Sequence, residues 1–373
     1  MIALSLWTQL FWTLLFPFED ARQDITEPQK EPPLNIVLMI GDGMGLSQMS
    51  SALFYGEGEP NFVRFPITGF SRTSSSSHKI TDSAAGATAF SCGEKTYNGA
   101  IAVGPDSVAL ETIIERLAKR DYRSGLVATS SITHATPASF YAHVDLRKKE
   151  FEIAEQLISS SVDFFAGGGK RFFFDRLDGR NLYSDLEAAE VVMDTNELKL
   201  RAWETDKRYG YLLSRDGMPR KIDGRGDFLP QATSMALDYL SQGDEPFFLM
   251  VEGSQIDWGG HANDGEYVYT EMRDFDEAMG RVLDFAEKDG NTLVIVTADH
   301  ECGGFALVSQ EVEVPFQGRQ RDYDSLRLAF NSGGHSATMV PVLAYGPGQE
   351  AFTGIYQNTA IYDKMLQALG GEK

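Results

Sequence analysis

Short apolar runs alternate with amphipathic segments along this 373-residue chain, and that alternation limits its fold more than any other feature. Several of the runs are continuous, as strands buried on both faces of a sheet are. The apolar runs occupy residues 35–40, 124–131, 162–168, 246–253, 291–300 and 339–348, and the amphipathic segments occupy 107–120, 231–242, 271–290 and 360–370. This order predicts an α/β fold with a doubly wound, mostly parallel central sheet and helices on both faces.

The chain shows no internal repeat and no low-complexity linker after residue 33, which favours one domain over residues 34–373. Two less regular stretches, near 170–228 and 305–332, are expected to form surface insertions. The almost wholly apolar residues 1–18 predict a signal peptide, followed by a polar tether over 19–33. We therefore expect export to the periplasm or the extracellular space, with a retained membrane anchor as the alternative.

Net charge and cysteine content exclude some classes of function and of metal site. The formal net charge of −21 argues against general nucleic-acid binding, which needs a basic face. An anionic substrate would have to be held by local cations. Cys92 and Cys302 are the only cysteines, so there is neither a disulfide framework nor a C-x-x-C metal site. Two packed thiols are expected, with a disulfide between them in an oxidising compartment as the alternative. Metal ligands are expected to be histidines and carboxylates.

Polar side chains follow four of the predicted strands. Because ligands bind beyond the carboxyl ends of parallel strands, these positions should converge on one edge of the sheet. They are Asp42 after the first strand, His134 and Thr136 after the second, Glu252 and Asp257 after 246–251, and Asp299 with His300 after 291–298.

Three of the six histidines lie beside carboxylates or glycines. Asp257 and His261 are four residues apart and can reach one ion, Asp299 and His300 are adjacent, and His335 follows two glycines. Histidine and carboxylate ligands suit catalytic zinc, and two zinc ions about 4 Å apart can clamp the attacking and leaving oxygens of an in-line displacement. The harder oxygens of Thr136 and Glu252 would favour magnesium.

A candidate nucleophile lies in the segment KITDSAAGATAF. Ser83 opens a run of small helix-forming residues, so its hydroxyl should sit at a helix N-terminus, where free N–H groups favour bound phosphate. The alternative is a structural serine that only caps the helix.

Five strings together resemble the alkaline phosphatase family, and the compact marine or cold-adapted bacterial members most of all. They are TDSAAGATA, SSITHATPASFYAHVDLR, EGSQIDWGGH, VTADHECGG and GGHSA, in the order in which the family has them, and the resemblance spans residues 35–348. It implies a phosphomonoesterase with two zinc ions and one magnesium ion, active at alkaline pH, and a homodimer.

The resemblance also implies roles for individual residues. Ser83 would become phosphoserine, Asp82 would orient the phosphate-binding loop, and Arg147 would clamp two phosphate oxygens. The first zinc would be held by Asp257, His261 and His335, the second by Asp42, Asp299, His300 and the Ser83 oxygen, and the magnesium by Asp42, Thr136 and Glu252, with His134 beside it.

Two positions depart from the best-known bacterial pattern. His134 stands where many bacterial members have aspartate, and Trp258 where many have lysine. An imidazole beside the third metal would weaken magnesium binding and admit zinc, and the loss of a lysine would loosen binding of the phosphate product. Both residues are expected near the phosphate.

The same architecture serves other enzymes. A sulfatase would need a C/S-x-P-x-R string, which does not follow Ser83, and a phosphodiesterase would need space where Arg147 is expected. A non-catalytic metal- or phosphate-binding protein would be expected to lack at least one site residue. Monoester hydrolysis is therefore preferred, with these readings as alternatives.

Overall fold

The computed structural model of the protein describes residues 35–370. The signal peptide and tether predicted for residues 1–33 lie outside this range. Within it, no helix combines the length and the apolar character needed to cross a bilayer.

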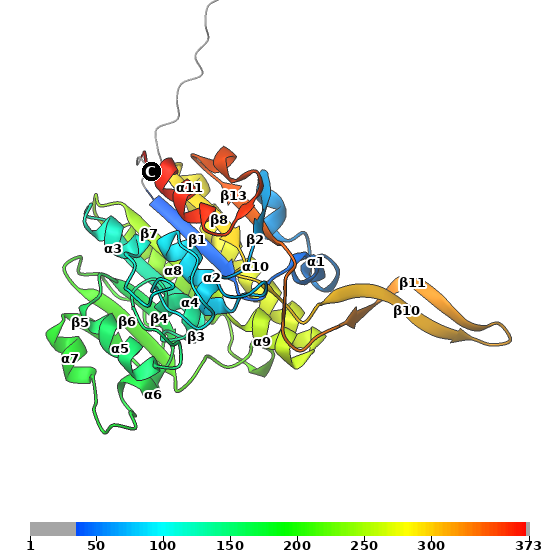
Figure 1. The fold of residues 1–373 in the computed structure, drawn as a ribbon, viewed down its shortest axis with the longest axis horizontal. Coiled ribbons are helices and arrows are strands. Elements are labelled where there is room, and N and C mark those ends of the chain that lie inside the picture. Colours follow the sequence, from blue (N-terminus) through cyan, green and yellow to red (C-terminus); the bar gives the residue numbers. More distant parts are fainter. Residues whose placement is uncertain (1–34, 371–373) are drawn as a thin grey trace, which may run out of the picture. The chain divides into compact units, whose positions relative to one another are not determined.

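A ten-stranded sheet forms the centre of the described chain, in the order β14-β2-β13-β8-β1-β7-β3-β4-β6-β5 (Figure 1). All its pairs are parallel except those of β13, which runs antiparallel to β2 and β8. The strands are β1 Asn35–Gly41, β2 Ile67–Arg72, β3 Arg123–Ser131, β4 Phe164–Gly168, β5 Val191–Asp194, β6 Arg208–Ser214, β7 Phe247–Gly253, β8 Thr292–Thr297, β13 Val340–Tyr345 and β14 Gly354–Gln357. The predicted mostly parallel α/β sheet is confirmed.

The central strands are buried at every position, which explains their continuous apolar sequences. β1 lies between β7 and β8, with Ile36 opposite both Phe248 and Leu293. Alternate β1 residues point to opposite faces, so Leu38 joins one core cluster and Met39 the other.

Helices cover both faces of this sheet (Figure 1). One core cluster takes residues from α2 Ser83–Cys92, α3 Ile113–Ala118, α5 Glu150–Ser159 and α11 Ala360–Ala368. The other takes residues from α1 Leu46–Tyr55, α8 Phe228–Leu240 and α10 Gly265–Asp289. The remaining helices are the 3-10 helices η1 Asn61–Arg64, η2 Lys221–Asp223 and η3 Gln349–Phe352, with α4 Ala135–Ala138, α6 Lys170–Phe173, α7 Tyr183–Ala188 and α9 Gln255–Ala262.

The two stretches expected as surface insertions differ from each other. Residues 170–228 do not form a simple insertion, because β5 and β6 extend one edge of the central sheet. β5 has only four residues, three of them half-buried, so its apolar run of three residues is shorter than those of the central strands. Residues 305–332 contain the antiparallel hairpin of β10 Ala306–Val314 and β11 Gly318–Ala329, which reaches away from the sheet in Figure 1.

Candidate functional site

The sheet brings the predicted polar residues together at the carboxyl ends of its central strands. Asp42 follows β1, Glu252 lies near the end of β7, and Asp299 follows β8, and all three are fully buried. Their donor atoms and those of neighbouring histidines form three overlapping clusters that can each hold a cation.

The first cluster contains Asp257, His261, Cys302 and His335. Asp257 and His261 lie one turn apart on α9, with His261 Nε2 3.4 Å from Asp257 Oδ2. His335 comes from the short strand β12 His335–Ser336. The Nε2 atoms of His261 and His335 are 3.1 Å apart.

The second cluster contains Asp42, Asp299 and His300. His300 Nε2 lies 3.4 Å from Asp42 Oδ1 and 3.1 Å from Asp299 Oδ2. The Ser83 hydroxyl oxygen is 3.3 Å from the same nitrogen. The His300 ring stacks on that of His335, with centroids 3.5 Å apart, so the first two clusters adjoin.

The third cluster contains Asp42, His134 and Glu252. Glu252 Oε2 accepts hydrogen bonds from Ser254 at 2.6 Å and from Ser130 at 3.1 Å. The Thr136 hydroxyl on α4 also faces Glu252 and is fully buried. Asp42 belongs to both this cluster and the second.

The hydrogen bonding of these residues fits bound cations. His261 Nδ1 lies 2.8 Å from the Gly333 carbonyl and His335 Nδ1 2.9 Å from the Thr81 carbonyl, so each Nδ1–H donates outward and each Nε2 lone pair points into the cluster. Two facing lone pairs at 3.1 Å repel each other, and either a bound cation or a shared proton would remove that repulsion. Several buried atoms of the cluster residues and of Thr136 have no hydrogen-bond partner, namely Asp42 Oδ1 and Oδ2, His134 Nδ1, Thr136 Oγ1, Glu252 Oε1, Asp257 Oδ1, Asp299 Oδ2 and His300 Nδ1.

Burial and the crowding of negative charges shift the pKa values of the acidic groups. Burial, with the charges of Asp299, Asp257 and Glu252, holds the pKa of Asp42 well above its ordinary value. Burial raises the pKa of Glu252 to about 7. Burying these carboxylates close together is unfavourable, because they lose hydration and repel one another. A positive charge among them would compensate for this.

Ser83 is the first residue of α2, as predicted, and it is not the cap. Asp82 is the N-cap, and its Oδ1 accepts a hydrogen bond from the Ala85 N–H at 3.1 Å. The Ser83 hydroxyl contacts His300 Nε2 instead of capping the helix, so the alternative of a merely capping serine is wrong. The free N–H groups of this helix end suit a phosphate oxygen.

Arg147 contacts Asp82, the residue before Ser83, and is held from two sides. Its Nη1 donates to Asp82 Oδ2 at 3.1 Å and its Nη2 to His134 Nε2 at 3.2 Å. The His134 ring also meets the edge of the Trp258 ring, with centroids 6.0 Å apart. Every site residue expected from the sequence thus lies in or beside the three clusters.

One member of the first cluster was missed. Metal ligands were expected to be histidines and carboxylates only, yet the Cys302 sulfur lies among them. Both cysteines are free and buried, as expected of packed thiols. The available signal was the position of Cys302 two residues after His300, which spacing alone does not distinguish from a core cysteine.

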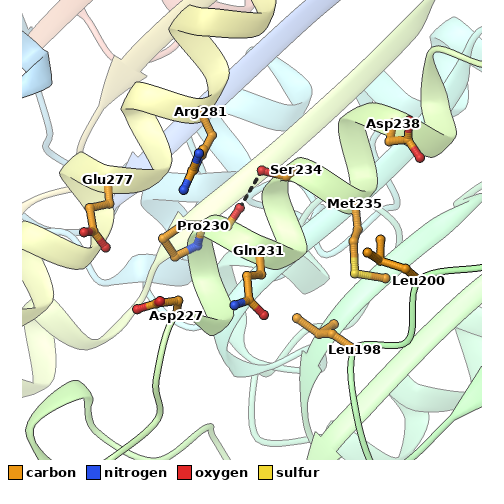
Figure 2. Close-up of a pocket in the computed structure, with 10 residues that line it drawn as sticks. All are labelled: Leu198, Leu200, Asp227, Pro230, Gln231, Ser234, Met235, Asp238, Glu277 and Arg281. Carbon is orange, nitrogen blue, oxygen red and sulfur yellow. Dashed lines mark hydrogen bonds between the residues drawn. The ribbon is translucent and has the colours of Figure 1, made fainter.

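A separate pocket of about 510 Å³ lies between α8, α10 and the loop at Leu198 and Leu200 (Figure 2). Its wall combines apolar side chains such as Met235 with Glu277 and Arg281. None of its lining residues belongs to the three clusters. The chemistry described above is therefore confined to the carboxyl edge of the sheet.

Comparisons with known proteins agree on one family. The family model for alkaline phosphatase matches residues 34–326. Alkaline phosphatase 3 of Bacillus subtilis is 34% identical, and the alignment covers 94% of this chain and 92% of that protein.

Solved structures agree as well. The alkaline phosphatase of the Antarctic bacterium TAB5 is 48% identical, with a TM-score of 0.89 over 92% of this chain and 99% of that one. A histidine-to-aspartate variant of that protein, with magnesium bound in its M3 site, gives the same identity and coverage and a TM-score of 0.90.

Proposed function

Because the chain belongs to the alkaline phosphatase family and is an enzyme that hydrolyses phosphate monoesters, we propose that Ser83 is its nucleophile and that the three clusters hold two zinc ions and one magnesium ion. The observation that supports this most directly is the Ser83 hydroxyl, 3.3 Å from His300 Nε2, at a helix N-terminus and beside buried donor atoms without partners.

The donor atoms suggest which cation each cluster takes. The first and second sites both combine imidazole nitrogens with carboxylate oxygens, which suits zinc. The first site consists of Asp257, His261 and His335, and the second of Asp42, Asp299, His300 and Ser83. Asp42, Thr136 and Glu252 supply oxygens for magnesium, but His134 adds a nitrogen. The magnesium in the M3 site of the TAB5 variant supports a third cation here. Cations in these sites would lower the pKa of a hydroxyl and neutralise phosphate charge.

The chain's own residues then perform the following steps. The phosphate binds with its oxygens toward the free N–H groups of α2 and the Arg147 guanidinium, whose planar fork matches two oxygens. The Ser83 hydroxyl gives up its proton, and its oxygen forms a bond to phosphorus while the bond to the alcohol oxygen breaks in line. The alcohol leaves after taking up a proton from solvent, and phosphoserine remains. Water attacks from the opposite side, inorganic phosphate leaves, and the Ser83 hydroxyl is restored.

The first test is hydrolysis of a chromogenic phosphomonoester at alkaline pH by the wild type, Ser83→Ala and metal-stripped enzyme. We expect both altered forms to lose activity, and the stripped form to regain it with zinc and magnesium. Ser91→Ala is a matched control, since Ser91 is buried on the same helix and its hydroxyl donates only to the Thr88 carbonyl and lies near Cys92. Full activity in Ser83→Ala would contradict the role of Ser83.

Three further proposals concern the substrate range, the oligomeric state and the export of the enzyme. The proposed contacts are with the phosphate group and not with the alcohol part of the substrate, so we propose that the enzyme hydrolyses a broad range of monoesters. Homodimerisation is proposed from the family resemblance, and sedimentation of the purified enzyme tests it. Export is proposed from the apolar residues 1–18, and N-terminal sequencing of the mature protein distinguishes cleavage from a retained anchor.

A further inference from the structure

The Cys302 thiol lies inside the first cation cluster, and nothing in the proposed mechanism uses it. Cys302 belongs to the two-residue strand β9 Glu301–Cys302, which pairs antiparallel with β12. In this pair Cys302 stands directly opposite His335. Residues opposite each other in an antiparallel pair point their side chains to the same side, so the sulfur and the imidazole face the cluster together.

Two glycines create the space in which the sulfur sits. A Cβ atom at Gly260 of α9 would lie 3.0 Å from the Cys302 sulfur, and a Cβ atom at Gly43 would lie 3.0 Å from the Cys302 Cβ. The cysteine therefore packs directly on bare backbone. A larger residue at Gly260 would force Cys302 or the backbone of α9 to shift.

The other donor atoms of the first cluster lie close to the Cys302 sulfur. One donor atom each from Asp257, His261, Cys302 and His335 lies within 4.8 Å of the other three. Asp257 Oδ1 is buried without a hydrogen-bond partner and lies 3.5 Å from His335 Nε2. An unpartnered carboxylate oxygen, inward-facing imidazole nitrogens and a fully buried sulfur form a donor set that could bind one cation.

We propose that Cys302 supplies a fourth protein donor to the first cation site, so that this site selects thiophilic cations such as zinc and cadmium over harder ones. The inference rests on the first cation site of the proposed function. On coordination the thiol proton passes to solvent and a sulfur lone pair is donated to the cation. Zinc can also take five ligands, so a fourth protein donor would still leave room for substrate.

Cadmium absorption tests this directly, because a cadmium–thiolate bond gives a charge-transfer band in the ultraviolet that nitrogen and oxygen ligands do not give. Metal-stripped wild type is titrated with cadmium while bound cadmium is counted. We expect the band to saturate with one sulfur-ligated cadmium per chain. Cys302→Ser should lose the band and bind cadmium at this site about tenfold more weakly.

Cys92→Ser is the matched control, because Cys92 is the only other cysteine and is buried at the end of α2, outside all three clusters. It should keep the band. Bound cadmium without a band in the wild type, or a band that survives in Cys302→Ser, would overturn the inference.

These outcomes are separate from those of the proposed function. A zinc-loaded wild type that hydrolyses monoesters but gives no band with cadmium contradicts only the role of Cys302. A protein that binds no cation and hydrolyses no monoester contradicts the metal-dependent mechanism itself.

Discussion

The Arg147 guanidinium donates through Nη2 to His134 Nε2 at 3.2 Å, which requires that ring nitrogen to carry no proton. Burial and the nearby Arg147 charge lower the pKa of His134 to about 3, so the ring is neutral and its proton sits on Nδ1. Nδ1 is buried and has no partner. A cation bound through Nδ1 would move the proton to Nε2 and end the hydrogen bond to Arg147, so cation binding at the third cluster and the proposed phosphate binding by Arg147 would be coupled.

His134→Asp should strengthen magnesium activation. A carboxylate offers magnesium a hard oxygen and still accepts a hydrogen bond from Arg147. We expect half-maximal activation at a magnesium concentration about tenfold lower than in the wild type, measured by activity during magnesium titration of the zinc-loaded enzyme. Unchanged activation would contradict the placement of His134 at this site.

Asp82→Asn should separate the two roles of Asp82, which caps α2 and forms an ion pair with Arg147. Asparagine caps a helix about as well as aspartate but lacks the charge that pairs with Arg147. We expect little change in stability, with KM raised roughly two- to fivefold because loss of the pair costs about 0.5–1 kcal/mol. Asp82→Ala also removes the bond to the Ala85 N–H and should lose a further 0.5–2 kcal/mol or so of stability in thermal unfolding. An unchanged KM in Asp82→Asn would exclude the orienting role.

Gly43→Ala should lower the cation content of the enzyme. Gly43 has φ +73°, and a Cβ atom there would lie 2.7 Å from the Asp257 Cα. Gly58 has φ +76° with open space around it, so Gly58→Ala carries the same backbone strain, about 1–2 kcal/mol, without the crowding. Bound zinc after gel filtration should fall only in Gly43→Ala. Equal zinc content in both variants would contradict this prediction.

Arg225→Met should be strongly destabilising. The Arg225 side chain is fully buried against Glu271 and Asp274, which are 2% and 0% exposed. Its removal leaves two buried carboxylates with only Lys221 nearby, which should cost about 3–5 kcal/mol in urea unfolding. Arg319→Met, in an exposed pair with Glu311, is the control and should change stability by less than about 1 kcal/mol. Similar losses in both variants would contradict the importance of burial.

Lys95 should make stability depend on pH in the alkaline range. Burial, with the nearby Arg72 charge, lowers the pKa of Lys95 from 10.5 to about 8. The folded state therefore binds this proton less tightly than the unfolded state does. The free energy of unfolding rises as pH increases from about 8 to 10.5, and the contribution of Lys95 is lost as pH falls through 8. Lys95→Met should lack this rise in melting temperature relative to wild type, whereas exposed Lys119→Met should retain it. Parallel curves for wild type and Lys95→Met would contradict the shift.

The sequence by itself determined the parts of this protein that depend on local pattern. Continuous apolar runs predicted the central strands because both faces of β1, β3, β7 and β8 are buried. The same logic placed polar residues such as Asp42 and Asp299 at one edge, since parallel strands end together. Ser83 was recognised at the start of α2 because the alanine-rich residues that follow it have a high helix propensity.

Only the tertiary structure decided the relationships between distant segments. Cys302 joins the first cluster because β9 pairs with β12, two strands of two residues each that leave no periodic signal. β5 was missed because its apolar run is only three residues long, and β6 because Arg208, Gly210 and Ser214 interrupt its apolar pattern although its middle is buried. The hydrogen bond from Arg147 to His134 likewise depends on side-chain positions that no spacing fixes. Periodicity records which face of an element is buried, whereas contacts between elements arise from packing.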